Sequence, residues 1–188
     1  LHRDLYQYSE KSIGGRFKNT QNYIAETHPD GTQTVRFMPL TPYETPEAID
    51  TICESFNQVV DSCDVDQLIL IPCFINDFLC IHPFNDGNGR MSRLLTTLLL
   101  YRCGYVVGRY ISIESKIEKT KSKYYDVLEQ SGIGWHEAEN DTTPFIKYIL
   151  GVILAAYREF ESRINLFDEK LPAVELVRRA ITEKIGKF

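Results

Sequence analysis

Two side chains that could move a proton and hold a metal ion lie four residues apart in the stretch HPFNDGNGRMSR, residues 82–93. His82 can accept a proton near pH 7, which suits a general base. Asp86 carries a carboxylate that would repel nearby phosphates unless a cation lay between them, so it is a natural Mg²⁺ ligand. The pair favours chemistry on a phosphate-containing substrate.

The glycines and arginines of the same stretch favour an anion site. Gly87 and Gly89 flank Asn88 at the expected start of a helix, where backbone N–H groups and the helix dipole attract phosphate. Arg90 and Arg93 are three residues apart, so both guanidinium groups can lean toward one face. A base, a metal ligand and an anion loop this close together indicate phosphoryl or nucleotidyl transfer. The spacing matches neither a Walker A loop nor a dinucleotide fingerprint.

Each of these residues has an ordinary structural explanation when it is taken alone. An isolated histidine is more often a hydrogen-bonded structural residue, and an aspartate before a helix is often a cap or a turn residue. A Gly-Asn-Gly sequence alone is typical of a turn. None of these explanations accounts for the spacing of the whole set, so the joint pattern favours the functional interpretation.

The elements on either side of this stretch must place it against a core. The apolar run LILIPCFINDFLCI, residues 68–81, predicts a central helix that is buried nearly all round. A second helix should begin near Asn88 and run to Cys103. Its inward face is expected to carry four leucines: Leu94, Leu95, Leu98 and Leu99. The stretch at 82–93 therefore joins two core helices.

The rest of the chain predicts more helices and one pair of strands. Residues 22–40 are typical of two short strands around a Pro-Asp-Gly turn, and residues 105–113 are expected to be extended. Further helices are expected in four places: from Thr45, near 114–130, near 145–167 and over 171–188. The fold class is an all-α bundle with one β-hairpin. We expect one domain over 1–170, followed by a C-terminal helix that could begin a further module.

Composition limits the classes of protein that the chain can belong to. The 188 residues include 43% hydrophobic ones and carry a net charge of −5, which is typical of a globular domain and argues against a basic nucleic-acid scaffold. The five cysteines form no C-x-x-C pair, so we expect reduced thiols. No signal peptide is visible, and the longest apolar run is too short to span a bilayer. We expect a cytoplasmic protein.

The stretch at 82–93 resembles the signature of the Fic (filamentation induced by cAMP) domain family, H-x-F-x-[DE]-G-N-G-R-x-x-R. Every specified position matches: His82, Phe84, Asp86, Gly87, Asn88, Gly89, Arg90 and Arg93. The resemblance extends to the hairpin and to the helices after the motif. It implies the Fic fold and the transfer of AMP from ATP to a Tyr, Thr or Ser hydroxyl of a target protein, with release of pyrophosphate.

The resemblance also implies a role for each residue of the motif. His82 would deprotonate the target hydroxyl, and Asp86 would hold Mg²⁺, or Mn²⁺, on the phosphates of the ATP co-substrate. Phe84 would anchor the nucleotide-binding loop in the core. The remaining motif residues would bind the nucleotide, three through the loop and two through guanidinium groups: Gly87, Asn88, Gly89, Arg90 and Arg93. A lysine in place of Gly89 marks the phosphorylating Doc-type variant, so the glycine favours nucleotidyl transfer.

Residues outside the motif complete the expected site. The hairpin at 22–40 resembles the family's flap, and Tyr23, Ile24 and Ala25 would dock the target segment. Tyr124 and Tyr125 lie on a stretch that resembles the family's helix near the nucleotide base, and we expect both to be core or pocket-wall residues rather than catalytic ones. Lys18 departs from the pattern, since many members carry Arg there.

Several alternatives remain open at this stage. The same site could remove AMP from a modified protein, or transfer UMP or phosphocholine, and a non-catalytic docking module could have kept the fold. Many Fic proteins carry an inhibitory helix with the pattern [ST]-x-x-x-E-[GN], whose Glu pairs with the second motif arginine, here Arg93. No Ser or Thr of the sequence begins that pattern, so we expect the helix upstream or on a partner. A homodimer is compatible with the sequence, and nucleic acid could bind only through a module outside it.

Overall fold

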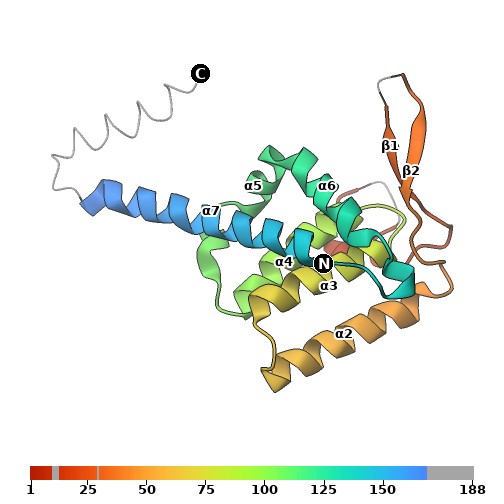
Figure 1. The fold of residues 1–188 in the computed structure, drawn as a ribbon, viewed down its shortest axis with the longest axis horizontal. Helices are drawn as coiled ribbons and strands as arrows, with labels where there is room; N and C mark the ends of the chain where they lie inside the picture. Colours follow the sequence, from red (N-terminus) through yellow and green to blue (C-terminus); the bar gives the residue numbers. More distant parts are fainter. Residues whose placement is uncertain (10–12, 29, 169–188) are drawn as a thin grey trace.

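The computed structural model describes residues 1–9, 13–28 and 30–168, and the C-terminal helix expected over 171–188 lies outside this part. The described part is a bundle of helices from which one β-hairpin projects at one end (Figure 1). The expected fold class is therefore confirmed. The helices and strands run in this order: α1 (His2–Leu5), β1 (Ile24–Thr27), β2 (Gln33–Phe37), α2 (Thr45–Ser62), α3 (Gln67–Ile81), α4 (Asn88–Arg102), η1 (Val106–Arg109), α5 (Ile113–Lys119), α6 (Lys121–Gly132), η2 (Trp135–Glu137) and α7 (Thr143–Asp168).

Helix α3 is the centre of the bundle, as its all-round apolar sequence predicts. It packs against α2, α4, α6 and α7, and Ile71, Ile75 and Ile81 are at most 1% exposed. The helix begins at an Asp66 cap, whose side chain accepts a hydrogen bond from the N–H of Leu68. It ends where the chemistry-bearing stretch begins, so the core fixes one end of that stretch.

Helix α4 begins at Asn88 as expected, but its inward face differs from the expected one. Leu99 is 6% exposed, whereas Leu94 and Leu98 are 41% and 40% exposed. The expectation that all four leucines face inward is therefore wrong for these two. The core-facing stripe instead passes through Met91, Leu95 and Leu99, at four-residue spacing, and residues one position earlier are rotated toward the surface.

The hairpin expected over 22–40 is confirmed. Strands β1 and β2 are antiparallel, with Ala25 opposite Val35 and Ile24 opposite Phe37. Gly31 in the connecting turn has a φ of 83°, a conformation that glycine adopts without strain. The hairpin stands away from the helices (Figure 1), and its base meets α6 through β2.

Residues 105–113 are not extended, contrary to the expectation from their β-branched and aromatic composition. They form the 3-10 helix η1 and the start of α5, because no strand lies beside them in the described structure and their apolar side chains pack on α7 instead. Val107 and Ile111 are buried against Ala156. Tertiary packing has overridden the local β preference here.

The helix expected near 114–130 is two helices, because the chain breaks at Thr120 between α5 and α6. The hydroxyl of Thr120 shares a hydrogen bond with the hydroxyl of Tyr148 on α7 at 2.7 Å, which fixes the break against the core. The expected long helix at 145–167 is confirmed as α7. Across the described residues, no helix combines the length and the apolar character that crossing a membrane requires.

Candidate active site

His82 lies where α3 ends, and both its backbone and its ring are held there. Its backbone is left-handed, with a φ of 53° and a ψ of 61°, and its N–H donates to the carbonyl oxygen of Phe78. The ring atom Nδ1 lies 3.2 Å from the carbonyl oxygen of Leu79. Because a carbonyl only accepts hydrogen bonds, Nδ1 carries the ring proton and Nε2 keeps a lone pair. The side chain therefore offers Nε2 as a base.

Burial keeps the His82 ring neutral. Desolvation lowers the pKa of His82 to about 4, an effect that the bond to Leu79 opposes and the positive charge of Lys18 reinforces. A neutral imidazole is the form that can accept a proton. An anion placed beside the ring would raise this pKa, so the basicity of His82 should increase when a phosphate-bearing substrate enters.

The turn after His82 is clasped by the side chain of Asn88. The Asn88 Nδ2 donates to the carbonyl oxygen of Phe84 at 2.6 Å, and its Oδ1 accepts from the Phe84 N–H at 2.9 Å. Asn88 is 2% exposed and Phe84 is 9% exposed. The Asn88 side chain therefore shapes the loop, and what it can offer an anion is its backbone N–H.

The start of α4 presents backbone donors next to Gly87 and Gly89. The first turn of a helix leaves its N–H groups without acceptors in the same helix. Gly87 has a φ of 88°, and a Cβ atom at this position would lie 2.8 Å from the hydroxyl oxygen of Tyr6, so only glycine fits. At Gly89 a Cβ atom would meet just the Nη1 of Arg93, at 3.5 Å. Because Gly89 has no side chain, a ligand could reach the N-terminus of α4 and the Arg93 side chain from the same side.

Asp86 and Arg90 come together at the same helix start. The Arg90 Nη2 lies 3.7 Å from Asp86 Oδ1, and both side chains are a little under half exposed. Arg90 also donates to the hydroxyl oxygen of Tyr6 at 2.5 Å and lies over the Tyr6 ring, 5.0 Å from its centroid. The guanidinium is thus oriented by the aromatic side chain of Tyr6, the residue that follows α1.

Arg93 is engaged by an acidic residue that the motif does not contain. Its Nε donates to Glu114 Oε1 of α5 at 3.0 Å, with the Arg93 side chain 22% and the Glu114 side chain 60% exposed. A carboxylate and a phosphate are alternative partners for one guanidinium. A phosphate that reaches Arg93 must therefore displace or share the Glu114 contact.

The residues present fit a magnesium ion that arrives with its phosphates. Among the described residues no three acidic, cysteine or histidine side chains gather into a metal site. Mg²⁺ bound with a nucleotide needs only one or two protein carboxylates, because phosphates and water complete its shell. Asp86, partly exposed beside the anion loop, supplies a carboxylate of that kind.

The two tyrosines of α6 have different surroundings. Tyr124 is 4% exposed and packs against Phe145 and Tyr148. Burial raises its pKa to about 12, although a hydrogen bond with Ser92 of α4 opposes this shift. Tyr125 is 52% exposed. The nucleotide contact of this pair stays a prediction, and Tyr125 is the member that a ligand could reach without a change in the core.

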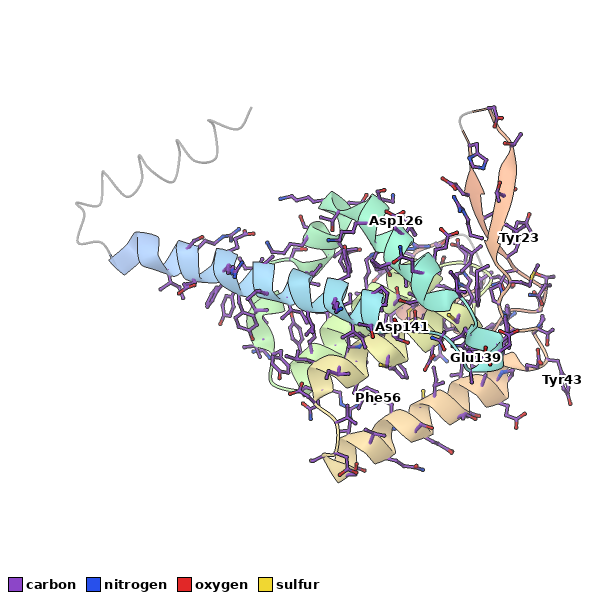
Figure 2. All side chains as sticks on the ribbon, viewed as in Figure 1. Tyr23, Tyr43, Phe56, Asp126, Glu139 and Asp141 are labelled. Atoms are coloured by element: carbon purple, nitrogen blue, oxygen red, sulfur yellow. The ribbon has the colours of Figure 1, made fainter. Side chains whose placement is uncertain are left out.

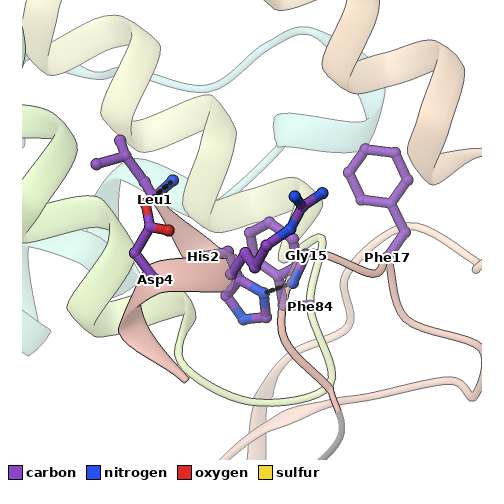
Figure 3. A pocket seen from close by; sticks show the side chains of 7 residues that line it. Leu1, His2, Asp4, Gly15, Phe17 and Phe84 are labelled. Carbon is purple, nitrogen blue, oxygen red and sulfur yellow. Dashed lines mark hydrogen bonds and ion pairs between the residues drawn. The ribbon is translucent and has the colours of Figure 1, made fainter. Parts of the chain in front are cut away.

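The N-terminal segment supports the loop from the other side. The His2 ring stacks on Phe84 with centroids 3.7 Å apart, accepts from the N–H of Gly15 through Nδ1, and lies 3.1 Å from the Asp86 carbonyl oxygen through Nε2. Figure 3 shows the His2–Gly15 bond and the hollow of about 360 Å³ beside it. None of the motif's ionisable side chains lines this hollow, so it belongs to the support of the loop.

Comparisons with known proteins identify the family of the chain. A family model described as the Fic/DOC family matches residues 1–100, more than half of the chain. The chain belongs to the Fic/DOC family. The match covers α1, the hairpin, α2, α3 and most of α4.

Relatives and solved structures extend the likeness to the later helices. The chain is 26% identical to protein adenylyltransferase fic-1 of Caenorhabditis elegans over 79% of this chain and 25% of that protein. It is 27% identical to protein adenylyltransferase Fic of Nematostella vectensis, again over 79% of this chain and 30% of that protein. The chain thus spans between a quarter and a third of these curated relatives. A crystal structure of a Fic-domain-containing signalling protein from Bacteroides thetaiotaomicron is 26% identical, with a TM-score of 0.64 over 82% of this chain and 58% of that one.

Of the hairpin residues expected to dock a target in this Fic domain, Tyr23 is exposed, whereas Ile24 and Ala25 are partly buried. Tyr23 is 55% exposed, and Figure 2 places it at the foot of the hairpin. Ile24 and Ala25 open β1, which pairs with β2 along one edge. Arg36 of β2 forms ion pairs with Glu26 of β1 and Glu129 of α6, so the hairpin is tied to the bundle. The docking role stays a prediction.

Sequence reasoning missed the residues that support the Fic motif from outside it. Asn22, His2, Tyr6 and Glu114 contact the motif directly, and Lys18 is a support of the loop although it was considered only as a possible nucleotide contact. The loop WHE at 135–137 contacts the hairpin rather than the motif: His136 stacks on Phe37 and lies 2.8 Å from the carbonyl oxygen of Met38. Most of these contacts join residues 60 or more positions apart, so no local pattern reveals them.

Proposed function

We propose that this Fic domain is a protein adenylyltransferase, which transfers AMP from ATP to a Tyr, Thr or Ser hydroxyl of a target protein and releases pyrophosphate. The observation that carries the proposal is the placement of His82: its Nδ1 lies 3.2 Å from the carbonyl oxygen of Leu79, an acceptor, which leaves the Nε2 lone pair available as a base. It stands five residues before a Gly-Asn-Gly helix start of the anion-binding kind. The curated relatives named above are called protein adenylyltransferases.

The chain's own residues would divide the reaction between them. His82 Nε2 takes the proton as the target oxygen bonds to the α-phosphorus, and the bond from that phosphorus to the oxygen bridging to the β-phosphate breaks. The leaving pyrophosphate carries the negative charge that the α4 N-terminus, Arg90 and Arg93 stabilise. Asp86 would hold Mg²⁺, which supplies charge neutralisation on the phosphates when bound.

The second glycine of the loop is Gly89 and not the lysine that marks the phosphorylating Doc-type variant, which supports nucleotidyl transfer. Gly89 leaves the helix start open, which suits a nucleotide that inserts its phosphates deeply. Removal of AMP, or transfer of UMP or phosphocholine, would use the same groups. We place the protein in the cytoplasm, in keeping with its unpaired cysteines, and we take Mg²⁺ or Mn²⁺ as its ion.

Labelled ATP tests the proposal. The protein is incubated with candidate targets and Mg²⁺, in parallel with ATP labelled at the α- or at the γ-phosphate. AMP transfer labels protein from the α-label alone, and His82→Ala serves as the control for the site. Label from the γ-phosphate would instead show phosphorylation, and no label from either, with labelled UTP or CDP-choline active, would show another donor.

A further inference from the structure

The backbone of the turn 81–84 is held by a segment that precedes the hairpin. Four consecutive carbonyl oxygens of this turn accept hydrogen bonds from residues 18 and 22. The Lys18 Nζ donates to Ile81 at 2.9 Å and the Lys18 N–H donates to Pro83 at 2.8 Å. The Asn22 Nδ2 donates to His82 at 3.1 Å and to Phe84 at 3.0 Å. The whole turn around the base is therefore bonded to two residues.

Those two residues are also bonded to each other and are largely removed from water. The Lys18 Nζ donates to Asn22 Oδ1 at 3.0 Å, and Lys18 is 3% exposed. Among the described residues no carboxylate lies within ion-pair distance of this ammonium. Burying an ammonium without an ion-pair partner is costly. The C-terminal end of α3, where the Ile81 carbonyl lies, offers a partial negative charge that offsets part of this cost.

The turn needs such support because His82 has an uncommon backbone conformation. A non-glycine residue in the left-handed region costs about 1 kcal/mol and persists only where its surroundings enforce it. The bonds from Lys18 and Asn22 to the carbonyls on both sides of His82 enforce it here. The direction of the His82 ring, and so of Nε2, follows from that backbone.

The same segment continues into the foot of the hairpin. Gln21 Nε2 donates to the carbonyl oxygen of Pro39 at 3.0 Å, which joins the segment before β1 to the segment after β2 at the base of the hairpin. Asn22 is followed directly by Tyr23 and β1. Residues 18–22 therefore connect the surface expected to hold a target with the turn that holds the base.

We propose that Lys18 and Asn22 are positioning residues of the transfer reaction, which hold His82 in register with the hairpin so that Nε2 meets the target hydroxyl. The proposal rests on the proposed function above, because it assigns the two residues to that same site. They touch no reacting atom and act through the backbone of His82. Their loss should lower the rate of the bound complex and leave ATP binding nearly unchanged.

Matched variants test whether Lys18 and Asn22 affect the rate of the bound complex without affecting ATP binding. Lys18→Met removes the ammonium at nearly constant length, and Asn22→Asp keeps the acceptor for Lys18 while it removes both donated bonds. Lys18→Arg keeps a cationic donor. Two exposed residues provide controls for the same chemical changes, Lys147→Met on α7 and Asn57→Asp on α2. For each variant kcat and the KM for ATP are measured with α-labelled ATP, together with the thermal unfolding temperature.

We expect kcat to fall tenfold to about a hundredfold in Lys18→Met and Asn22→Asp, the scale of a misplaced catalytic group, with a KM for ATP within about twofold. Lys18→Arg should recover most of the loss, and the two controls should match the wild type. Wild-type kcat in folded Lys18→Met and Asn22→Asp would overturn the proposal. So would equal losses in kcat and in ATP affinity. If Lys18→Met does not fold, Asn22→Ala takes its place under the same criteria.

A second measurement needs no activity and separates this proposal from the proposed function. The ¹⁵N shifts of the His82 ring at pH 7.5 report which nitrogen carries the proton. The wild type should show the Nδ1–H form, and Asn22→Asp should show a mixture with the Nε2–H form as the turn loosens. If the proton of the His82 ring stays on Nδ1 alone in Asn22→Asp, the positioning role is contradicted. If the Asn22→Asp variant shows the expected mixture of ring forms but the wild type labels no protein, only the proposed function is contradicted.

Discussion

The motif at 82–93 and the segment at 1–22 contribute to one site in different ways. The motif carries the groups that we propose act on a substrate, and its short-range contacts, such as Asn88 with Phe84, lie within four residues. The N-terminal segment carries none of those groups, yet His2, Tyr6, Lys18 and Asn22 all bond to the motif across the fold. The difference shows that the chemistry is local in sequence, whereas its geometry depends on distant residues.

The largest effect should follow from removing the base itself. His82→Ala should lower protein labelling at least about a hundredfold, the usual scale for a lost general base. ATP affinity should barely change, because phosphate binding falls to the α4 start and the arginines. Labelling and equilibrium binding of ATP are measured on the same preparation, and near-normal labelling would show that another group is the base.

Changing Gly87 tests where the two regions touch. Gly87→Ala places a Cβ atom 2.8 Å from the Tyr6 hydroxyl oxygen at a φ of 88°, so both a clash and backbone strain are expected. We expect a loss of about 1–3 kcal/mol in the free energy of unfolding, measured by urea denaturation. Tyr6→Phe in the same chain removes the clashing oxygen.

The double variant Gly87→Ala/Tyr6→Phe should recover part of that loss, and Tyr6→Phe alone sets its baseline. The strain of the left-handed backbone remains, so recovery should be incomplete. If the double variant recovers nothing, the N-terminal segment does not constrain the loop at this point.

The hairpin should matter for the protein target more than for ATP. Tyr23→Glu places a charge on the exposed foot of β1, where an extended target segment could pair. Labelling of a protein target is expected to fall several-fold while the KM for ATP stays constant. The exposed Tyr43→Glu, on the segment before α2, provides the control. Equal losses in target labelling and ATP affinity would assign the hairpin to the nucleotide.

The smallest effect is expected at Glu114. Its exposed ion pair with Arg93 contributes little by itself, but it occupies a guanidinium that a phosphate would use. Glu114→Gln should tighten ATP binding by about two- to fivefold, and Glu118→Gln on the same helix should not. The effect should vanish in Arg93→Ala.

An upstream or partner helix that inhibits through Arg93 would compete with Glu114 as well as with ATP, and the isolated chain is expected to label targets without activation.

The sequence predicts the parts of this protein that repeat a local pattern. The hairpin follows from its turn residues, and the central position of α3 follows from its apolar run. The expected extended stretch at 105–113 failed because its burial partner, Ala156 on α7, is about fifty residues away. The expectation for Leu94 and Leu98 failed because the four leucines occupy a wide arc of the helix, and only the side that carries Leu95 and Leu99 meets the core.

Prediction of the candidate site from the sequence is limited in the same way. All eight motif residues could be found from the sequence, because their types and spacing together match one specific pattern. Asn22 and His2 could not be found, since an asparagine before a strand and a histidine near the chain start have many ordinary roles. In the sequence, Lys18 stands out only as a departure from a family pattern. Its supporting role becomes apparent only from the structure, in which it is buried.

The state of the His82 ring in solution tests the central claim most directly, and NMR titration of that ring measures it. Desolvation lowers its pKa to about 4 from an ordinary value of 6.5, so the neutral form should persist as the pH falls below 6.5 and be lost only near 4. With a non-hydrolysable ATP analogue and Mg²⁺ bound, the pKa should rise, because the phosphates stabilise the protonated ring. The account predicts a neutral Nδ1–H ring at pH 7 whose pKa moves upward on binding. A ring that titrates near 6.5 in the free protein, or that carries its proton on Nε2, would contradict it.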